Sequence, residues 1–132
     1  MKGTVKIGTV GEERFVVSEK HLIDFAQDGM PKILCTPWLI WFLEHAARNA
    51  VIPMLESGES TVGVDINVKH IAATPLGENV VCRARVINTD DTLISFQFEA
   101  FDQHEKIAKG THKMHVIQVE RLARKVAKKE QL

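Results

Sequence analysis

The fold is decided by residues 36–44, which read Thr-Pro-Trp-Leu-Ile-Trp-Phe-Leu-Glu. Thr36 suits the N-cap of a helix and Pro37 suits its first turn. We predict that this helix runs to Val51 and ends at Pro53. The six residues after Pro37 are all apolar, so this part of the helix has no polar face. Because such a helix is buried on several sides, a sheet must wrap around it, alone or together with a partner subunit.

Strand patterns dominate the rest of the chain. Residues 4–17 predict a broken strand that turns at Gly8 and Gly11. A clean alternation from Val62 then places every second residue on one face. The first face holds Val62, Val64, Ile66, Val68 and His70, and the other holds Gly63, Asp65, Asn67 and Lys69. Further strands are predicted at 79–87, 93–101 and 106–119. One long helix followed by antiparallel strands is an α+β pattern. We predict a hotdog fold, an antiparallel sheet wrapped around one long central helix.

Composition narrows the class of protein. The chain has 132 residues, 45 % of them hydrophobic, with 17 basic and 17 acidic side chains and no net charge. This balance gives no general attraction to nucleic acid or to an anionic membrane. Cys35 and Cys82 are too few for a disulfide framework. The chain opens without a leader pattern, so we expect a cytoplasmic protein. We expect a single domain over 1–120 and a basic, solvated helical tail over 121–132.

Two polar residues in apolar surroundings are candidates for catalysis. Glu44 follows the apolar run of the helix, where an unpaired carboxylate is costly and requires a partner or a raised pKa. The alternative is that Glu44 reaches the rim of the helix and pairs with His45 or Arg48. His70 continues the apolar face of its strand, where a histidine is either a catalytic group or a satisfied core residue.

Other reactive side chains have simpler explanations. Thr36 is explained by helix capping, although its hydroxyl also suits a substrate contact or a nucleophile next to a base. Cys35 lies among apolar residues, which favours an inert, buried thiol. His112 and His115 are three residues apart on a predicted strand, so they point to opposite faces and cannot share a metal ion.

Several ordered motifs together resemble one known family. They are residues 36–44, residues 60–64 leading to His70, Ala-Ala-Thr-Pro-Leu-Gly at 72–77, and Ile-Ala-Lys-Gly-Thr-His at 107–112. The chain from about Val5 to Val119 is similar to the small hotdog-fold acyl-CoA thioesterases, and most similar to their fluoroacetyl-CoA thioesterase branch. The resemblance implies that Thr36, Glu44 and His70 form a catalytic triad. It also implies that the N–H of Gly63 stabilises an oxyanion at the thioester carbonyl.

The resemblance implies an assembly as well. Members of this family are homodimers whose two sheets join edge to edge, with active sites at the subunit interface and without a metal or redox cofactor. Thr36 and Glu44 are separated by about 12 Å along a continuous helix. One thioester does not easily reach both side chains. Either Thr36 lies in a segment that folds back before the helix, or the site combines residues from two subunits. We predict the second, a composite site in which Glu44 comes from the second subunit.

Two departures from the family argue against specificity for fluoroacetyl-CoA. Gln27 and Met30 stand where the fluoroacetyl-specific enzyme has phenylalanines that gate its site, and Met114 stands where the family has an arginine. Met30 and Met114 are candidates for lining an apolar acyl pocket together with Leu34 and Trp38. The alternative is that all four side chains only pack against their neighbours. Candidates for contacting the CoA phosphates are Lys69, Arg83, Arg85 and Lys113.

Three functions follow from these residues. The leading prediction is hydrolysis of an acyl-CoA thioester to a free acid and CoA, with Glu44 as general base or nucleophile. The alternative is a module that binds acyl-CoA, or an acylated partner, without turnover, because a fold does not fix a function. A carboxylate with a histidine also suits hydration of an enoyl-CoA, although the surrounding motif is less similar to that of hydratases.

Overall fold

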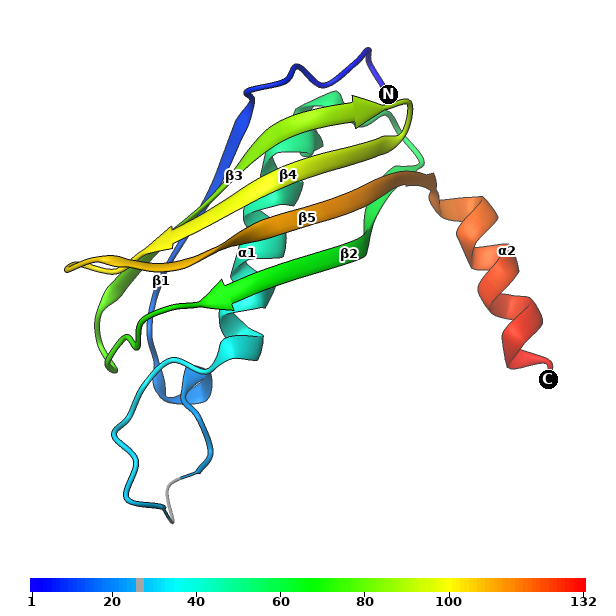
Figure 1. Cartoon of the computed structure of the whole chain (residues 1–132). Coiled ribbons are helices and arrows are strands. Elements are labelled where there is room, and N and C mark those ends of the chain that lie inside the picture. The colour runs from blue at the N-terminus through cyan, green and yellow to red at the C-terminus, as the bar shows by residue number, and fades with distance from the viewer. Residues whose placement is uncertain (26–27) are drawn as a thin grey trace.

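The computed structural model describes residues 1–25 and 28–132 (Figure 1). The described residues form five strands and two α-helices. The strands are β1 (Val10–Val16), β2 (Glu59–His70), β3 (Asn79–Asp90), β4 (Leu93–Phe101) and β5 (Lys106–Gln118). The helices are α1 (Thr36–Val51) and α2 (Val119–Glu130), with short 3-10 turns η1 (Glu19–His21) and η3 (Ile52–Met54).

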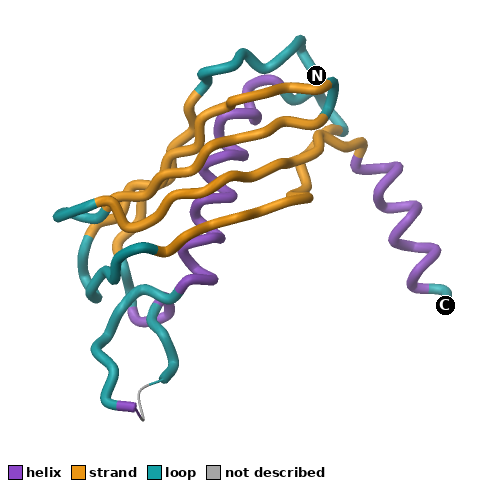
Figure 2. The backbone as a smooth tube through the Cα atoms, viewed as in Figure 1, coloured by secondary structure: helices purple, strands orange, loops and turns teal. Residues whose placement is uncertain are grey.

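The five strands form one antiparallel sheet in the order β1-β3-β4-β5-β2. The sheet curls over one side of α1, and α1 runs across the strands on that inner face (Figure 2). This confirms the predicted hotdog architecture. Strand β2 is the last strand of the sheet, so its outer edge has no neighbour within the described residues.

The core lies between α1 and the inner face of the sheet. Alternate residues of β3 and β4 point into it, as the sequence predicts, because side chains in a strand alternate between the two faces. These residues are Val80, Cys82, Ala84 and Val86 on β3, and Ile94, Phe96, Phe98 and Ala100 on β4. The helix contributes Leu39, Phe42, Leu43, Ala46, Ala47, Ala50 and Val51. The sheet covers only one side of α1, which leaves Trp41 47 % exposed.

Gly11 is not a turn, contrary to the prediction. It lies within β1, where a Cβ atom would collide with the backbone carbonyl oxygen of Ala46. The missing side chain lets α1 pack directly against β1. Gly8 is a turn residue as predicted, with a φ of 93° that glycine adopts without strain.

The N-terminus of α1 differs from the prediction by one residue. Cys35 occupies the N-cap position, Thr36 is the first helical residue, and no side chain caps the helix. The hydroxyl of Thr36 is therefore free of a capping role. The other end agrees with the prediction, because the α-helix ends at Val51 and Pro53 lies in the 3-10 turn that follows.

A bulge corrects the predicted faces of β2. Gly63 pairs with Met114 and Asp65 pairs with Lys113, so Val64 is an extra residue with no partner on β5. Directly opposed residues of an antiparallel pair share a face. Before the bulge, Gly63 therefore shares the helix-facing side of the sheet with Met114. Beyond it, His70 shares that side with Ala108. The predicted alternation put Gly63 and His70 on opposite faces, and the extra residue brings them to the same one.

Helix α2 stands apart from the rest of the chain and buries none of its residues (Figure 1). It begins two residues before the tail predicted at 121–132. Its exposed positions carry the basic side chains that the sequence assigned to a solvated helix. Within the described ranges, no helix combines the length and the apolar character needed to cross a membrane.

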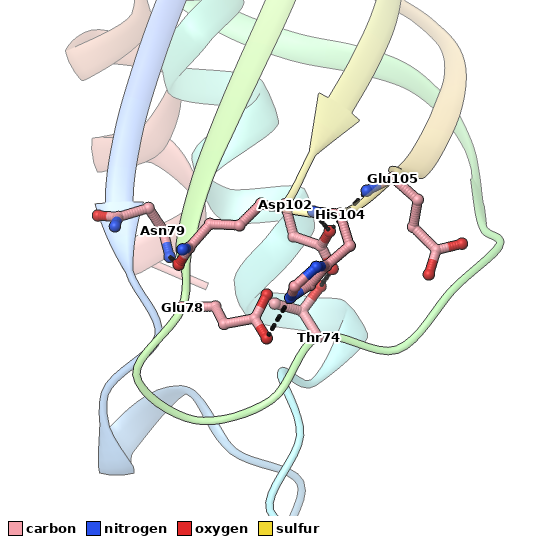
Figure 3. Close-up of polar contacts among 7 residues, drawn as sticks. Thr74, Glu78, Asn79, Asp102, His104 and Glu105 are labelled. Atoms are coloured by element: carbon pink, nitrogen blue, oxygen red, sulfur yellow. Dashed lines mark hydrogen bonds and ion pairs between the residues drawn. The ribbon is translucent and has the colours of Figure 1, made fainter.

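Hydrogen bonds join the turn between β4 and β5 to the loop that follows His70 (Figure 3). Asp102 Oδ1 accepts hydrogen bonds from the backbone amides of His104 (2.8 Å) and Glu105 (2.9 Å). Its Oδ2 accepts one from the hydroxyl of Thr74, which is fully buried (3.0 Å). Two more contacts join the same segments: His104 Nε2 with Glu78 Oε2 (3.2 Å), and the amide of Asn79 with Gln103 Oε1 (2.9 Å).

We expect Asp102→Ala to lower the free energy of unfolding by about 2 kcal/mol, because three donors lose an ionised acceptor. Burial tends to raise the pKa of Asp102, but the hydrogen bonds from His104, Glu105 and Thr74 outweigh it and lower that pKa. The stabilisation is therefore complete above the pKa of the unfolded state and is lost as the pH falls through the lower folded value. Urea unfolding at pH 7 and at pH 3 measures both effects. A gap between wild type and variant that is equal at the two pH values would contradict this account.

Candidate active site

Thr36 and His70 form a hydrogen-bonded pair. Thr36 Oγ1 lies 2.8 Å from His70 Nδ1. The first turn of α1 positions the threonine, and the end of β2 positions the histidine. The pair adjoins a hollow of about 280 Å³ with mostly aliphatic walls. Its lining residues are Ile23, Ile33, Leu34, Thr36, His70, Ile71, Ala72 and Ala73.

The surroundings of His70 favour its neutral form. Burial lowers the pKa of His70, and a backbone hydrogen bond with Ala72 opposes the shift only in part. Its Nε2 atom is buried and has no hydrogen-bond partner within the described residues. A neutral imidazole carries one proton, so the bond to Thr36 has two forms. Either the threonine hydroxyl donates to Nδ1, or Nδ1–H donates to the hydroxyl oxygen. The first form leaves a proton on Nε2 that can be donated to a ligand.

A second, larger hollow also adjoins Thr36. Its volume is about 610 Å³, and Thr36 is common to both hollows. The lining residues are Lys20, Leu22, Ile23, Asp24, Phe25, Cys35, Thr36, Pro37 and Trp38. The ammonium nitrogen of Lys20 lies over the ring of Trp38, 5.2 Å from the ring centroid. The threonine hydroxyl thus stands where two cavities meet, one apolar and one with a cation and an aromatic wall.

Glu44 lies in a different place from the one the sequence predicts. The residue is exposed, not buried, because β2 is the edge strand and the carboxylate reaches its open side above Gly63. The predicted alternative, pairing with His45 or Arg48, is not formed, and within residues 1–25 and 28–132 Glu44 makes no ion pair. His45 instead stacks on Trp41, with ring centroids 3.8 Å apart.

His112 completes the surroundings of Glu44. A Cβ atom on Gly63 would lie 3.2 Å from Glu44 Oε2 and 3.2 Å from His112 Cε1. These residues line a hollow of about 270 Å³ together with Val64, Asp65 and Ile66. Sequence reasoning considered His112 only as a metal ligand and missed this position. The signal was available, because His112 alternates with the buried residues Ala108 and Met114 on β5.

The predicted triad is therefore divided within one chain. Thr36 and His70 adjoin one hollow, and Glu44 lines another with Gly63. Both parts lie on the helix-facing side of β2, at the free edge of the sheet. No group of three or more His, Cys, Asp or Glu side chains within the described part of the chain is placed to hold a metal ion.

The remaining predicted binding residues have varied positions. Met30 is 43 % exposed, whereas Met114 is 1 % exposed and belongs to the hydrophobic core. Neither lines the hollows around Thr36 and Glu44, so their contact with a substrate stays a prediction. Gln27 lies outside the described residues. Arg83, a candidate for CoA phosphates, is 2.7 Å from Glu12 on the neighbouring strand β1.

The chain is similar to known proteins over nearly its whole length. Residues 17–120 match the model of a family described as fluoroacetyl-CoA-specific thioesterase. A fluoroacetyl-CoA thioesterase of Streptantibioticus cattleyicolor is 32 % identical over 98 % of this chain and 97 % of that protein. A solved structure of the fluoroacetyl-CoA thioesterase FlK superposes with a TM-score of 0.88 at 28 % identity, over 96 % of this chain and 98 % of that one.

A more distant structure supports the fold alone. It is a thioesterase superfamily member from Thermus thermophilus, with a TM-score of 0.86 at 23 % identity, covering 97 % of both chains. The family match spans the hydrogen-bonded Thr36–His70 pair, Glu44, Gly63 and His112, and both sequence and structure agree over nearly the whole length. The chain belongs to the fluoroacetyl-CoA-specific thioesterase family.

Proposed function

We propose that the protein hydrolyses acyl-CoA thioesters to a free acid and CoA, with Thr36, Glu44 and His70 at its active site. The observation that carries the proposal is the 2.8 Å hydrogen bond between Thr36 and a half-buried, neutral His70 beside an apolar hollow. A histidine whose pKa is shifted by burial and that is bonded to a hydroxyl beside a hollow is typical of a functional site. Membership of a thioesterase family supplies the reaction class.

Glu44 acts in this proposal as the general base. The carboxylate removes a proton from water while the water oxygen bonds to the thioester carbonyl carbon. The tetrahedral intermediate then loses the CoA thiolate, which takes up the proton held by Glu44. His70 and Thr36 orient the thioester, and the amide N–H of Gly63 is the proposed donor to the carbonyl oxygen.

The acyl group is proposed to occupy the hollow beside His70. Its walls come mainly from Ile23, Ile33, Leu34 and Ile71, which offer apolar contact and no charge. A space of about 280 Å³ suits a short aliphatic chain. We therefore expect activity on short, unfluorinated acyl-CoAs as well as on fluoroacetyl-CoA, the substrate in the name of the Streptantibioticus relative.

We propose further that two copies of the chain build each site. Thr36 and Glu44 are about 12 Å apart along α1, more than one thioester group spans. Both parts of the site border the unpaired edge of β2. Pairing of two such edges is favourable, since it satisfies backbone groups that are otherwise left to water. Thr36 and His70 of one protomer would then face Glu44 and Gly63 of its partner.

Release of free CoA thiol from a panel of acyl-CoAs tests the function. The panel runs from acetyl through medium to long chains and includes fluoroacetyl-CoA. We expect turnover with a maximum at short chains. Tight binding of one member with no thiol release would instead identify an acyl-CoA binding module. Neither binding nor release across the panel would contradict both functions.

Mixed dimers test the composite site. Glu44→Gln and His70→Ala chains carry different affinity tags, are expressed together, and are purified through both tags. If each site draws on two protomers, the mixed dimer has one complete site and regains about half of the wild-type rate. Each variant alone should stay inactive. A mixed dimer as inactive as its parents, or a protein that is monomeric in light scattering, would overturn the composite site.

A further inference from the structure

The imidazole of His112 is held in one tautomer. Its Nδ1 lies 3.0 Å from the backbone carbonyl oxygen of Asp65. A carbonyl oxygen only accepts hydrogen bonds, so Nδ1 must carry the proton. The ring is neutral, because burial lowers the pKa of His112 and outweighs the opposing effects of Asp65 and Glu44. Nε2 is therefore a bare acceptor. The bulge in β2 is what brings the Asp65 carbonyl next to this ring.

That acceptor has no partner. Nε2 of His112 is buried and makes no hydrogen bond within the described residues. The rest of the ring packs well, since it stacks on Phe98 with centroids 5.1 Å apart and planes 19° apart. A phenylalanine would keep an aromatic ring against Phe98 and would bring no unsatisfied Nε2, although it would lose the bond to Asp65. The nitrogen thus requires a donor that is supplied by something other than the chain.

The geometry around Gly63 indicates which donor this is. The place of its missing side chain is 3.2 Å from Oε2 of Glu44 and 3.2 Å from Cε1 of His112, the ring carbon between Nδ1 and Nε2, and the three residues line one hollow. Two acceptors therefore border the same small space. A carbonyl oxygen or a phosphate would be repelled by both. A water molecule carries two O–H donors and satisfies both, with its lone pairs left facing outward. Glu44 is long and exposed, so rotation of its side chain admits this water.

We propose that His112 and Glu44 together hold the water molecule that attacks the thioester, one O–H donated to Nε2 and the other to the carboxylate. This inference rests on the proposed hydrolysis and deepens it. Glu44 takes the proton that it already binds, the oxygen forms the bond to the carbonyl carbon, and the C–S bond breaks. His112 keeps its single proton on Nδ1 throughout and fixes the direction of attack.

Three substitutions separate this role from a structural one. His112→Phe keeps the packing on Phe98 and removes both nitrogens. His112→Asn places an N–H donor near Nδ1, so it keeps the bond to Asp65 but has no acceptor at the position of Nε2. His112→Gln places its side-chain oxygen near Nε2, so it keeps the acceptor.

We expect kcat on the best acyl-CoA to fall roughly 100-fold in the phenylalanine and asparagine variants, the size of effect seen when a reactant is misplaced. KM should change less than about twofold, since the water is not part of substrate binding. The glutamine variant should recover at least about tenfold over asparagine. Recovery by asparagine without recovery by glutamine, or wild-type kcat in the phenylalanine variant, would overturn the proposal.

His21→Phe is the matched control. His21 is also buried at 4 % exposure, is packed against aromatic rings, and has an unpartnered Nε2. It lies outside the proposed machinery, so this variant should keep the wild-type kcat. An equal loss of kcat there would attribute the effect to any buried histidine and would overturn the proposal.

Two measurements on the wild-type protein test the proposal even if a variant does not fold. The ¹⁵N chemical shifts of wild-type His112 report its tautomer, and a proton on Nε2 would overturn the inference. The thiol-release panel on the wild type tests the proposed function separately. Turnover that requires Glu44 but does not depend on His112 would remove this inference alone, whereas absence of turnover would remove both.

Discussion

Replacing Glu44 by glutamine is expected to lower kcat by about 1,000-fold, within the range of general acid–base catalysis. The amide has nearly the same shape as the carboxylate but cannot accept a proton from water. The fold should not change, because the residue is exposed and makes no ion pair within the described ranges. We expect the free energy of unfolding to stay within about 0.5 kcal/mol of the wild type.

Glu120→Gln is the control for this substitution. Glu120 is an exposed glutamate on α2, and its one ion pair within the described residues is with Arg124, 3.3 Å away. Its replacement should leave kcat unchanged. Near-normal turnover in Glu44→Gln would remove Glu44 from the mechanism.

A single turnover in H₂¹⁸O tests how Glu44 acts. General-base catalysis puts the label into the product acid in the first turnover. Attack by the carboxylate itself expels the CoA thiolate and forms an anhydride with the acyl group, and water that then attacks the Glu44 carbonyl carbon puts the label into Glu44 and leaves the first product acid without it. We expect labelled acid. Unlabelled acid would keep the thioesterase function and contradict the general-base route.

The second large effect is expected at Thr36. Thr36→Val keeps the shape of the side chain but removes the hydroxyl that lies 2.8 Å from His70. We expect kcat to fall about 100-fold, because the imidazole loses the group that orients it. Stability should change little, since the threonine is exposed and caps no helix end.

The pair should act as a unit. In a double-mutant cycle with His70→Gln, the double variant should lose about as much activity as the more damaging single variant. Losses that multiply would show that the two residues act independently and would contradict the pair. Thr111→Val on the exposed face of β5 is the control and should leave kcat unchanged.

The helix and the inner strands could be predicted from the sequence because one local pattern determines each. The apolar run after Pro37 and the alternation in 93–101 are signals that the structure reproduces nearly residue for residue. Thr36, Glu44 and His70 became candidates for the site because polar residues stand out in apolar surroundings, and the family resemblance grouped them as a triad. The structure brings Thr36 and His70 together and places Glu44 at a separate hollow.

The features that could not be predicted from the sequence depend on contacts between distant segments. A bulge is a property of two paired strands, so the alternation around Val64 gives no sign of it. The exposure of Glu44 follows from β2 being the edge strand, which is set by topology. The role proposed for His112 depends on Gly63 and Asp65, which are nearly fifty residues away along the chain.

The extra residue in β2 also limits how this site can vary. Gly63 and His70 are separated by an odd number of positions, and in a regular strand such residues face opposite ways. Val64 restores a common orientation by adding one position without a partner. Loss of this single residue would leave every reactive group in the sequence and still turn either Gly63 or His70 away from α1. The common orientation of Gly63 and His70 depends on the number of paired positions between them. Val64, which has no reactive group of its own, sets that number.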